Sequence, residues 1–316
     1  IRRHGFFQPN FTIIRMLVAE NTTAAKTGRK AKRRMRVVLA VVLVLAAAAL
    51  WVWRTDWAWQ AVKPHIESFL TREVLFFMLV GFVAQMIDGA LGMAYGLSST
   101  SFLLGLGVPP ALASSSVHVA EVFTAGVAGL SHLKMGNVNK RLFQRLVLPG
   151  VIGAIAGAYV LSSIDGSVIK PYIAVYLLVM GIVVMYKAFG KQPLIPRGEK
   201  TLAPLALFGG FMDAVGGGGW GPIVASTLLG KGHQPRFAIG SVNLAEFFIA
   251  LAGAVTFVTL IGTGNWHIIA GLVLGGSVAA PFAAYLCRRF APRTLMIMVG
   301  VLIIGLSIRT LVMAFG

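Results

Sequence analysis

The chain has 316 residues, of which 57% are hydrophobic and only 12% charged, and its mean hydropathy is +0.81. Soluble domains carry about 25% charged residues, and several apolar runs here reach the roughly 20 residues that cross a bilayer. The composition therefore predicts an all-α integral membrane protein. A single cysteine, Cys287, excludes an internal disulfide framework and a metal site built from several cysteines.

The first 36 residues form a basic segment that runs directly into an apolar one. The net charge is +18, and much of it comes from this segment. A basic cluster beside a membrane span marks the cytoplasmic side. We therefore expect a cytoplasmic tail (1–36) and an extra transmembrane helix (37–53). The helix ends in WVWRTDWAW without a signal-peptide cleavage site. A transit peptide and a nucleic-acid-binding arm are less favoured, so we expect no nucleic acid as partner.

Two stretches of the chain repeat each other at a shift of 125 residues. FVAQMIDGALGMAYGLSSTS (82–101) matches the region of FGGFMDAVGGGGWGPIVAST (208–227). The shift pairs Asp88 with Asp213, Gly96 with Gly221, and Glu121 with Glu246. Acids and glycines in constant register are hard to obtain by chance, so we infer an internal duplication, which is typical of transporters.

Each copy is predicted to contain the same elements. A short apolar stretch (74–87, 202–212) leads to a glycine-rich break, and a second short stretch (97–106, 222–229) follows it. Three full-length helices come next, at 110–133, 142–163 and 167–187 in the first copy and at 236–262, 267–287 and 293–313 in the second. The predicted domains are the tail (1–36), the extra helix with its linker (37–72), repeat 1 (73–190), a cytoplasmic linker (191–201) and repeat 2 (202–316).

Each short pair is either one broken helix that crosses the membrane or a re-entrant hairpin. At about 1.5 Å per residue, neither piece spans a hydrocarbon core of about 30 Å. The positive-inside rule favours the hairpin. With two hairpins, all but five of the 28 Lys and Arg are cytoplasmic, the exceptions being Arg54, Lys63, Arg72, Lys170 and Arg309. Three crossings per copy then predict two inverted-topology repeats around a site near the midplane.

The breaks DGALGMAYG and DAVGGGGWG favour an anion site. A half-helix that begins at Gly96 or Gly221 presents unsatisfied N–H groups and the positive end of its dipole. The candidate substrate-binding residues of the breaks are Gly92, Tyr95, Gly96, Ser98, Ser99, Gly217, Gly218, Gly219, Trp220 and Gly221. We expect Tyr95 and Trp220, which are equivalent, to wall the cavity. The alternative is that the glycines only allow close helix packing.

Four of the ten carboxylates are predicted at membrane depth, and they form two equivalent pairs: Asp88, Glu121, Asp213 and Glu246. Burying a carboxylate is costly unless it is paired or protonated. These four are the candidate proton-coupling residues. For Asp88 and Asp213 a second interpretation stays open, in which each caps the broken backbone.

His118 lies three residues before Glu121 and so shares its helix face. Its equivalent is Asn243, and both are candidate substrate-binding residues. His118 can titrate beside the acid or simply donate a hydrogen bond to it. His and Glu at this spacing also suit a metal, but the second copy lacks the histidine. We therefore expect no metal and no cofactor.

Several of these blocks together resemble the TauE/SafE sulfite exporter family, also called TSUP. They are the duplicated D-G-x-x-G break, the P-x-x-A-x-x-S stretch before the helix with the acid, the G-N near the end of that helix, and GVIGAIAGAY. The resemblance covers about residues 74–315. It implies export of a small sulfur-containing anion such as sulfite, sulfoacetate or another organosulfonate, across the bacterial inner membrane.

Three functions stay open on the residues alone. A proton-coupled secondary transporter with alternating access uses both the half-helices and the titrating acids. A passive anion channel or uniporter shares the half-helix site but needs no titrating acid. A cation or metal transporter would use the acids as ligands. No nucleophile–base arrangement of an enzyme is present in the sequence. A homo-oligomer also stays open.

Overall fold

The computed structural model describes residues 71–91, 93–189, 201–262, 266–289 and 292–315, together with Gln60 and Phe69. Residues Leu70–Gly316 form one compact unit, which contains almost every described residue. The predicted tail (1–36) and extra helix (37–53), almost all of the predicted cytoplasmic linker, and Gly92 lie outside the described residues.

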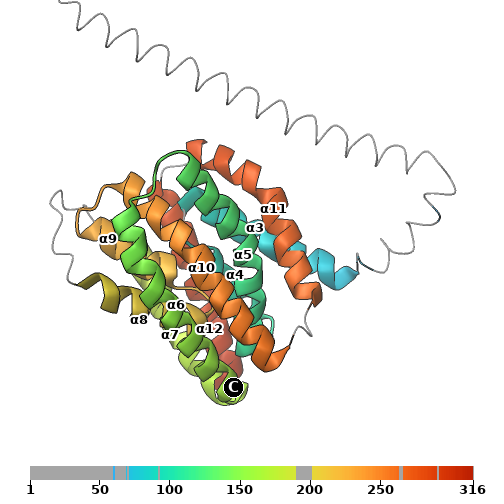
Figure 1. The fold of residues 1–316 in the computed structure, drawn as a ribbon. Coiled ribbons are helices and arrows are strands. Elements are labelled where there is room, and N and C mark those ends of the chain that lie inside the picture. The colour runs from blue at the N-terminus through green and yellow to red at the C-terminus, as the bar shows by residue number, and fades with distance from the viewer. Residues whose placement is uncertain are drawn as a thin grey trace, which may run out of the picture. The chain divides into compact units, whose positions relative to one another are not determined.

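The described part of this unit is helical throughout, as the composition predicts (Figure 1). The first half of this unit contains α3 (Arg72–Leu91), α4 (Tyr95–Gly105), α5 (Pro110–Lys134), α6 (Lys140–Ser163) and α7 (Gly166–Lys187). The second half contains α8 (Leu202–Gly216), the π-helical turn η2 (Gly221–Ala225), α9 (Ser226–Gly230), α10 (Pro235–Ile261), α11 (Trp266–Arg289) and α12 (Pro292–Phe315).

Five of the described helices are long and apolar enough to cross a membrane: Pro110–Lys134, Lys140–Ser163, Gly166–Lys187, Pro235–Ile261 and Met296–Phe315. Shorter apolar helices occupy Leu202–Gly216, Gly221–Gly230 and Trp266–Ala279. Large apolar side chains such as Val127, Leu148 and Val312 are exposed on the long helices. Because exposed apolar surface on this scale suits lipid rather than water, the chain is a multi-pass membrane protein.

The first short arm is longer than the sequence predicts. The helix α3 has 20 residues and continues through Asp88 to Leu91 before the chain breaks. Such a helix measures about 30 Å, so the first arm is longer than the predicted stretch of residues 74–87. The reason is that Gly89 and Ala90 are tolerated inside the last turn of the helix, whereas the corresponding helix α8 ends at Gly216.

Each broken pair begins and ends at the same end of the helical bundle. Lys231, which follows α9, donates a hydrogen bond from Nζ to Oγ1 of Thr201, which precedes α8. In the first half, the start of α3 and the chain after α4 line one pocket, to which both Arg72 and Pro109 contribute. In each half, the start of the first short arm and the chain after the second short arm therefore lie close together.

The helices of the two halves pack in an arrangement that agrees with a duplication. The first helix of each half packs against a long helix of the other half: α3 packs against α11, and α8 packs against α6. The remaining long helices pack against their own counterparts, α5 against α10 and α7 against α12. Figure 1 shows α5 and α10 crossing the middle of this unit, with α3 beside α11.

Glycines bring the paired helices into backbone contact. A Cβ atom on Gly153 of α6 would lie 2.1 Å from the carbonyl oxygen of Leu207 in α8. In the equivalent pair, a Cβ on Gly275 of α11 would lie 1.9 Å from the carbonyl oxygen of Met78 in α3. Small residues at helix interfaces allow this approach in membranes. Part of the glycine content therefore does serve helix packing, as the alternative interpretation of the glycines holds.

We expect Gly153→Ala to destabilise the protein by roughly 1–3 kcal/mol, because α6 must move away from α8 to admit the methyl group. The control is Gly305→Ala, where a Cβ meets nothing within 4 Å. Thermal unfolding of both variants in detergent measures the difference. Equal melting temperatures for the two variants would contradict the close packing of α6 on α8.

Candidate functional site

The two helix breaks meet inside the bundle. A Cβ on Gly96, in the first turn of α4, would lie 2.7 Å from the Cα of Gly218 and 3.0 Å from the carbonyl oxygen of Gly217. A Cβ on Gly221, at the start of η2, would lie 2.8 Å from the Cβ of Met93. The repeat register pairs Met93 with Gly218. The start of each second arm therefore contacts the break of the other half.

The second break needs glycine for its backbone conformation. Gly217 has φ +64° and Gly218 has φ +153°, values that L side chains rarely adopt. Neighbouring side chains hold the carbonyl groups of this break. Thr100 donates its hydroxyl to the oxygen of Gly217 at 2.5 Å, and Tyr176 of α7 donates its hydroxyl to the oxygen of Gly218 at 3.0 Å. Sequence reasoning missed Tyr176, one of three tyrosines in the predominantly apolar helix α7.

One oxygen of each buried aspartate caps the break that follows it. Asp88 accepts hydrogen bonds at Oδ1 from the N–H groups of Ala94, at 2.8 Å, and of Tyr95, at 3.1 Å. Asp213 accepts one at Oδ1 from the N–H of Trp220, at 2.8 Å. The capping interpretation is thus correct for these oxygens. It also corrects the expectation of free donors, because Asp88 occupies two of the N–H groups at the start of α4.

The two aromatic side chains anchor the half-helices. Tyr95 donates its hydroxyl to the carbonyl oxygen of Leu272 in α11, and Trp220 donates Nε1–H to that of Val242 in α10, each at 3.2 Å. Both rings are buried. A Cβ on Gly150 of α6 would lie 3.0 Å from the ring of Trp220. Because their polar atoms are bonded to backbone, Tyr95 and Trp220 pack the half-helices against α11 and α10, and their role as cavity walls stays a prediction.

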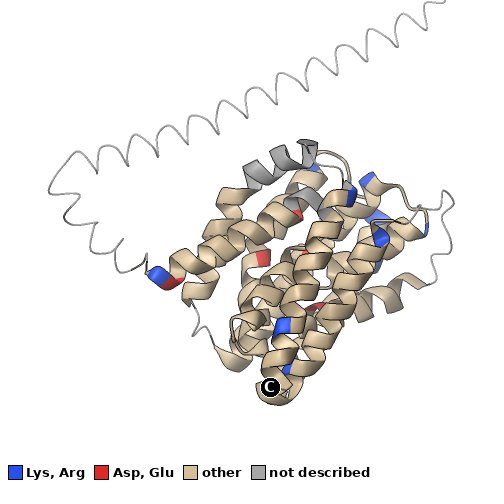
Figure 2. Cartoon of the chain, turned by 180° about the vertical axis from the view of Figure 1, so that it is seen from behind, with Lys and Arg blue, Asp and Glu red and all other residues tan. Residues whose placement is uncertain are grey.

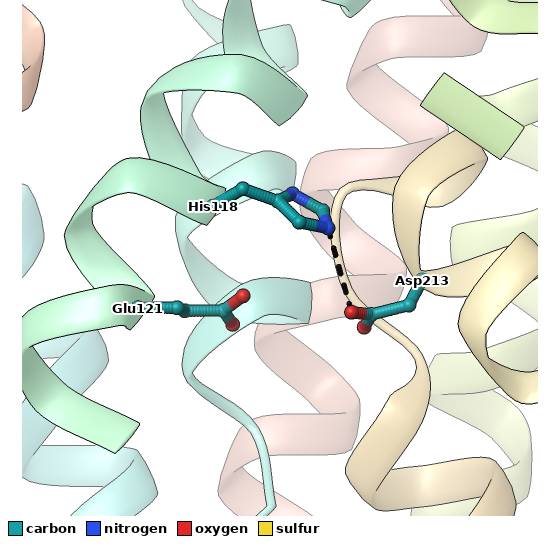
Figure 3. A group of neighbouring side chains, drawn as sticks. All are labelled: His118, Glu121 and Asp213. Atoms are coloured by element: carbon teal, nitrogen blue, oxygen red, sulfur yellow. Dashed lines mark ion pairs between the residues drawn. The ribbon is translucent and has the colours of Figure 1, made fainter. Parts of the chain in front are cut away.

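Three titratable side chains from different halves face one another beside the meeting point (Figure 3). His118 and Glu121 lie on α5, and Asp213 lies near the end of α8; their exposed fractions are 0%, 4% and 1%. His118 Nε2 lies 3.5 Å from Asp213 Oδ2. One nitrogen or oxygen atom from each of the three lies within 4.8 Å of the others.

The group of three adjoins the start of α4. A Cβ on Gly96 would lie 2.7 Å from Oε1 of Glu121. The carboxylate of Glu121 therefore lies beside the first turn of α4, where the sequence predicts the anion. Further along α4, Ser98 and Ser99 are fully buried. The hydroxyl of Ser98 has no hydrogen-bond partner among the described residues.

The orientation of the His118 ring is fixed. Its Nδ1 lies 2.9 Å from the carbonyl oxygen of Ser114, so Nδ1 carries a proton and donates it there. The ring packs edge-on against Phe257, at 5.6 Å between centroids. Among the described residues, Nε2 of His118, Oε2 of Glu121 and Oδ2 of Asp213 have no hydrogen-bond partner.

The other candidates lie at the edge of this region. Asp88 and Glu246 are half-buried, and the carboxylate of Glu246 lies within electrostatic range of Asp88 and Asp213. Asn243 is half-buried, and its carbonyl oxygen packs against Gly129 of α5. Gly219 packs against the ring of Tyr176.

A lysine that the sequence assigned to the cytoplasmic cluster reaches the second break. Lys187, at the end of α7, donates from Nζ to the carbonyl oxygen of Pro222 at 3.0 Å and to the hydroxyl of Ser226. It also lines a small cavity together with both breaks, through Met93 and Pro222. Only the three-dimensional approach of α7 to η2 brings this positive charge here.

The family model for the sulfite exporter TauE/SafE matches residues 77–310. The chain belongs to this family. It is 44% identical over 250 residues to "Probable membrane transporter protein YtnM" of Bacillus subtilis, a match that covers 76% of this chain and 83% of that protein. A "Probable membrane transporter protein" of Haemophilus influenzae is 29% identical, over 64% of this chain and 81% of its own length. No solved structure matches the chain significantly.

Membership of the TauE/SafE family makes this chain a membrane transporter and not an enzyme, as the sequence predicts. The matched range, 77–310, includes both helix breaks and all four buried or half-buried acids. The family match and the meeting point of the breaks thus concern the same part of the chain.

Proposed function

We propose that the protein is a secondary transporter, an exporter of small sulfur-containing anions such as sulfite, sulfoacetate or other organosulfonates, coupled to protons and working by alternating access. The observation that carries the proposal is that each half-helix contacts the break of the other half, beside buried acids. Broken helices that meet at the boundary between repeats are the usual position of a transporter's substrate site. The family's description as a sulfite exporter supports the substrate class.

The anion binds at the start of α4 in this proposal. The N–H groups of Gly96 and Leu97 belong to the first turn, where intrahelical acceptors are lacking, and the helix dipole favours an anion there. In the structure these groups are covered, because a Cβ on Gly218 would lie 2.3 Å from the nitrogen of Leu97. An anion can therefore reach the site only when the two breaks move apart, as alternating access requires.

Ionised acids around the proposed site repel an anion, so positive charge must neutralise some of them before the anion can enter. Protons on Asp88, Glu121, Asp213 and Glu246 supply that charge in this proposal. Among the described residues, no lysine or arginine side chain lies between these acids. Lys187 lies at the second break instead. Anion binding and proton binding then favour each other, which is the thermodynamic basis of coupling.

The two halves have opposite topology in the membrane, with the N-terminal tail in the cytoplasm of a bacterial cell. Figure 2 supports this proposal, since most of the described Lys and Arg gather at the end of the bundle away from the C-terminus. That end contains the loop after α5 and the start of α10, where Arg236 donates from Nε to Oδ1 of Asn137 at 2.6 Å. The positive-inside rule makes it the cytoplasmic end.

We expect opposite labelling of two cysteines introduced in a Cys287→Ser background. Met135→Cys lies in the loop after α5 and should react with an impermeant thiol reagent only from the cytoplasmic side. Ile164→Cys lies between α6 and α7 and should react only from the periplasmic side. Both positions are exposed in the structure. Labelling of both from one side would contradict the topology.

The coupling is tested by uptake of labelled sulfite and sulfoacetate into proteoliposomes, with and without an inside-alkaline pH gradient. We expect wild type to accumulate anion when the gradient is present. Glu246→Gln should reduce the uptake to equilibration, because the glutamine cannot bind and release a proton. Glu73→Gln is the control, since the Glu73 side chain is 70% exposed. Equilibration that ignores the gradient in wild type would indicate a channel or uniporter instead.

Lys187 lines a small cavity with residues of both breaks, so we propose that the anion passes its ammonium group. Lys187→Gln should then raise the KM for a divalent or monovalent sulfonate by about tenfold or more, because a charge-assisted hydrogen bond contributes roughly 1.5–3 kcal/mol. Lys187→Arg keeps the charge and should retain most of the affinity. Lys170→Gln, at the opposite end of α7, is the matched control. An unchanged KM in Lys187→Gln measured by the same uptake assay would remove Lys187 from the anion pathway.

A further inference from the structure

We propose that one coupling proton is held across the boundary between the halves, between Nε2 of His118 on α5 and Oδ2 of Asp213 on α8, beside Glu121. This inference rests on the proposed proton coupling and names the site of that proton. Figure 3 shows the three side chains pointing toward one another from the two elements, with the His118–Asp213 pair marked.

The hydrogen bonds around the pair leave one place for a proton. His118 uses its Nδ1–H on the carbonyl oxygen of Ser114, so the neutral ring directs the lone pair of Nε2 at Asp213. Asp213 uses Oδ1 on the N–H of Trp220, so Oδ2 is its remaining acceptor. Two acceptors that face each other without a proton repel. One proton placed between them makes a charge-assisted hydrogen bond, the stronger kind.

The separation of 3.5 Å is longer than such a bond, which is typically about 2.7–2.9 Å between the heavy atoms. Protonation should therefore shorten the distance between Nε2 of His118 and Oδ2 of Asp213, and loss of the proton should lengthen it. Because α5 belongs to one half and α8 to the other, this proton lies at the boundary between the two halves.

Glu121 couples the pair to the anion site. Its Oε1 lies beside Gly96 at the start of α4, and its Oε2 has no partner among the described residues. Without a proton, Glu121 and Asp213 place two negative charges where the anion must bind. With the proton on the His118–Asp213 pair, the negative charge of the three side chains falls from two to one, and the anion meets less repulsion.

Other titratable groups also face this site, and each can modify its titration. They are Asp88 from α3, Glu246 from α10, Tyr95 from α4 and Tyr176 from α7. None of them lies at the equivalent of His118, which in the second half is Asn243. Asparagine does not titrate, so the second half lacks this pair. The duplicated protein therefore carries one such proton per chain rather than two.

The first test is nitrogen-15 NMR of histidine-labelled full-length protein in lipid nanodiscs. His118→Asn assigns the signal by its loss, and the fold should tolerate asparagine because the second half has one at that place. We expect the His118 signal to keep a protonated Nδ1 at every pH and to gain a proton at Nε2 as pH falls. An Nε2 that stays unprotonated from pH 5 to pH 9 would overturn the proposal.

The second test compares pH profiles of sulfoacetate uptake, since one titrating group changes a rate by up to about tenfold per pH unit. We expect the profile to flatten in His118→Asn and in Asp213→Asn, which keeps Oδ1 as acceptor for Trp220. The control is His267→Asn, because His267 Nε2 also lies 3.5 Å from an acid, Oε2 of Glu73, but the two side chains are 28% and 70% exposed. This control should keep the profile of wild type.

The outcomes separate the inference from the proposed function. A wild type that ignores the pH gradient refutes the proposed coupling. A wild type that follows the gradient, with unchanged profiles in both variants, refutes only the proton site. Elemental analysis gives a further outcome. One zinc ion per purified wild-type chain, lost in His118→Asn, would also overturn the proton site, because His118, Glu121 and Asp213 would then be metal ligands.

Discussion

The contact between the two helix breaks is the constraint on which the rest of the site depends. Backbone inside a bilayer must find all its hydrogen-bond partners within the protein. Here the partners come from both halves: Asp88 and Asp213 cap the helix starts, and Thr100 and Tyr176 hold the carbonyls of the second break. Since the carbonyl oxygen of Gly217 is bonded by Thr100 of the other half, the second break is not satisfied by its own half alone, and the two halves must fold against each other.

The same contact places negative side chains where an anion is proposed to bind. Each aspartate has a structural duty at one oxygen, so it cannot simply be replaced by an apolar residue without exposing backbone donors. The cost of the buried charge is therefore a consequence of the broken helices. A protein that moves an anion through such a site has to neutralise that charge in each cycle, and protons are the simplest means.

The sequence predicts the long helices well because their signals are local. Apolar length and the starts at Pro110, Pro235 and Asn139 place helix bounds within a few residues. His118 and Glu121 are also local, at helical spacing. Asp213 faces His118 only because α5 of one half packs near α8 of the other, and Lys187 reaches Ser226 for a similar reason. Sequence periodicity does not reveal such contacts. The length of α3 was underestimated because Gly89, which lies inside the helix, was interpreted as the start of the break.

The two halves differ where they meet, and the differences lie together. Gly218 corresponds to Met93, and His118 corresponds to Asn243. The half with histidine on its long helix faces the break with four consecutive glycines, whereas the half with asparagine faces the break that contains Met93. A methionine side chain fills space that Gly218 leaves to the backbone. The duplication therefore gives two equivalent halves that can move relative to each other. Of the two equivalent positions, only His118 can bind a proton, whereas Asn243 cannot.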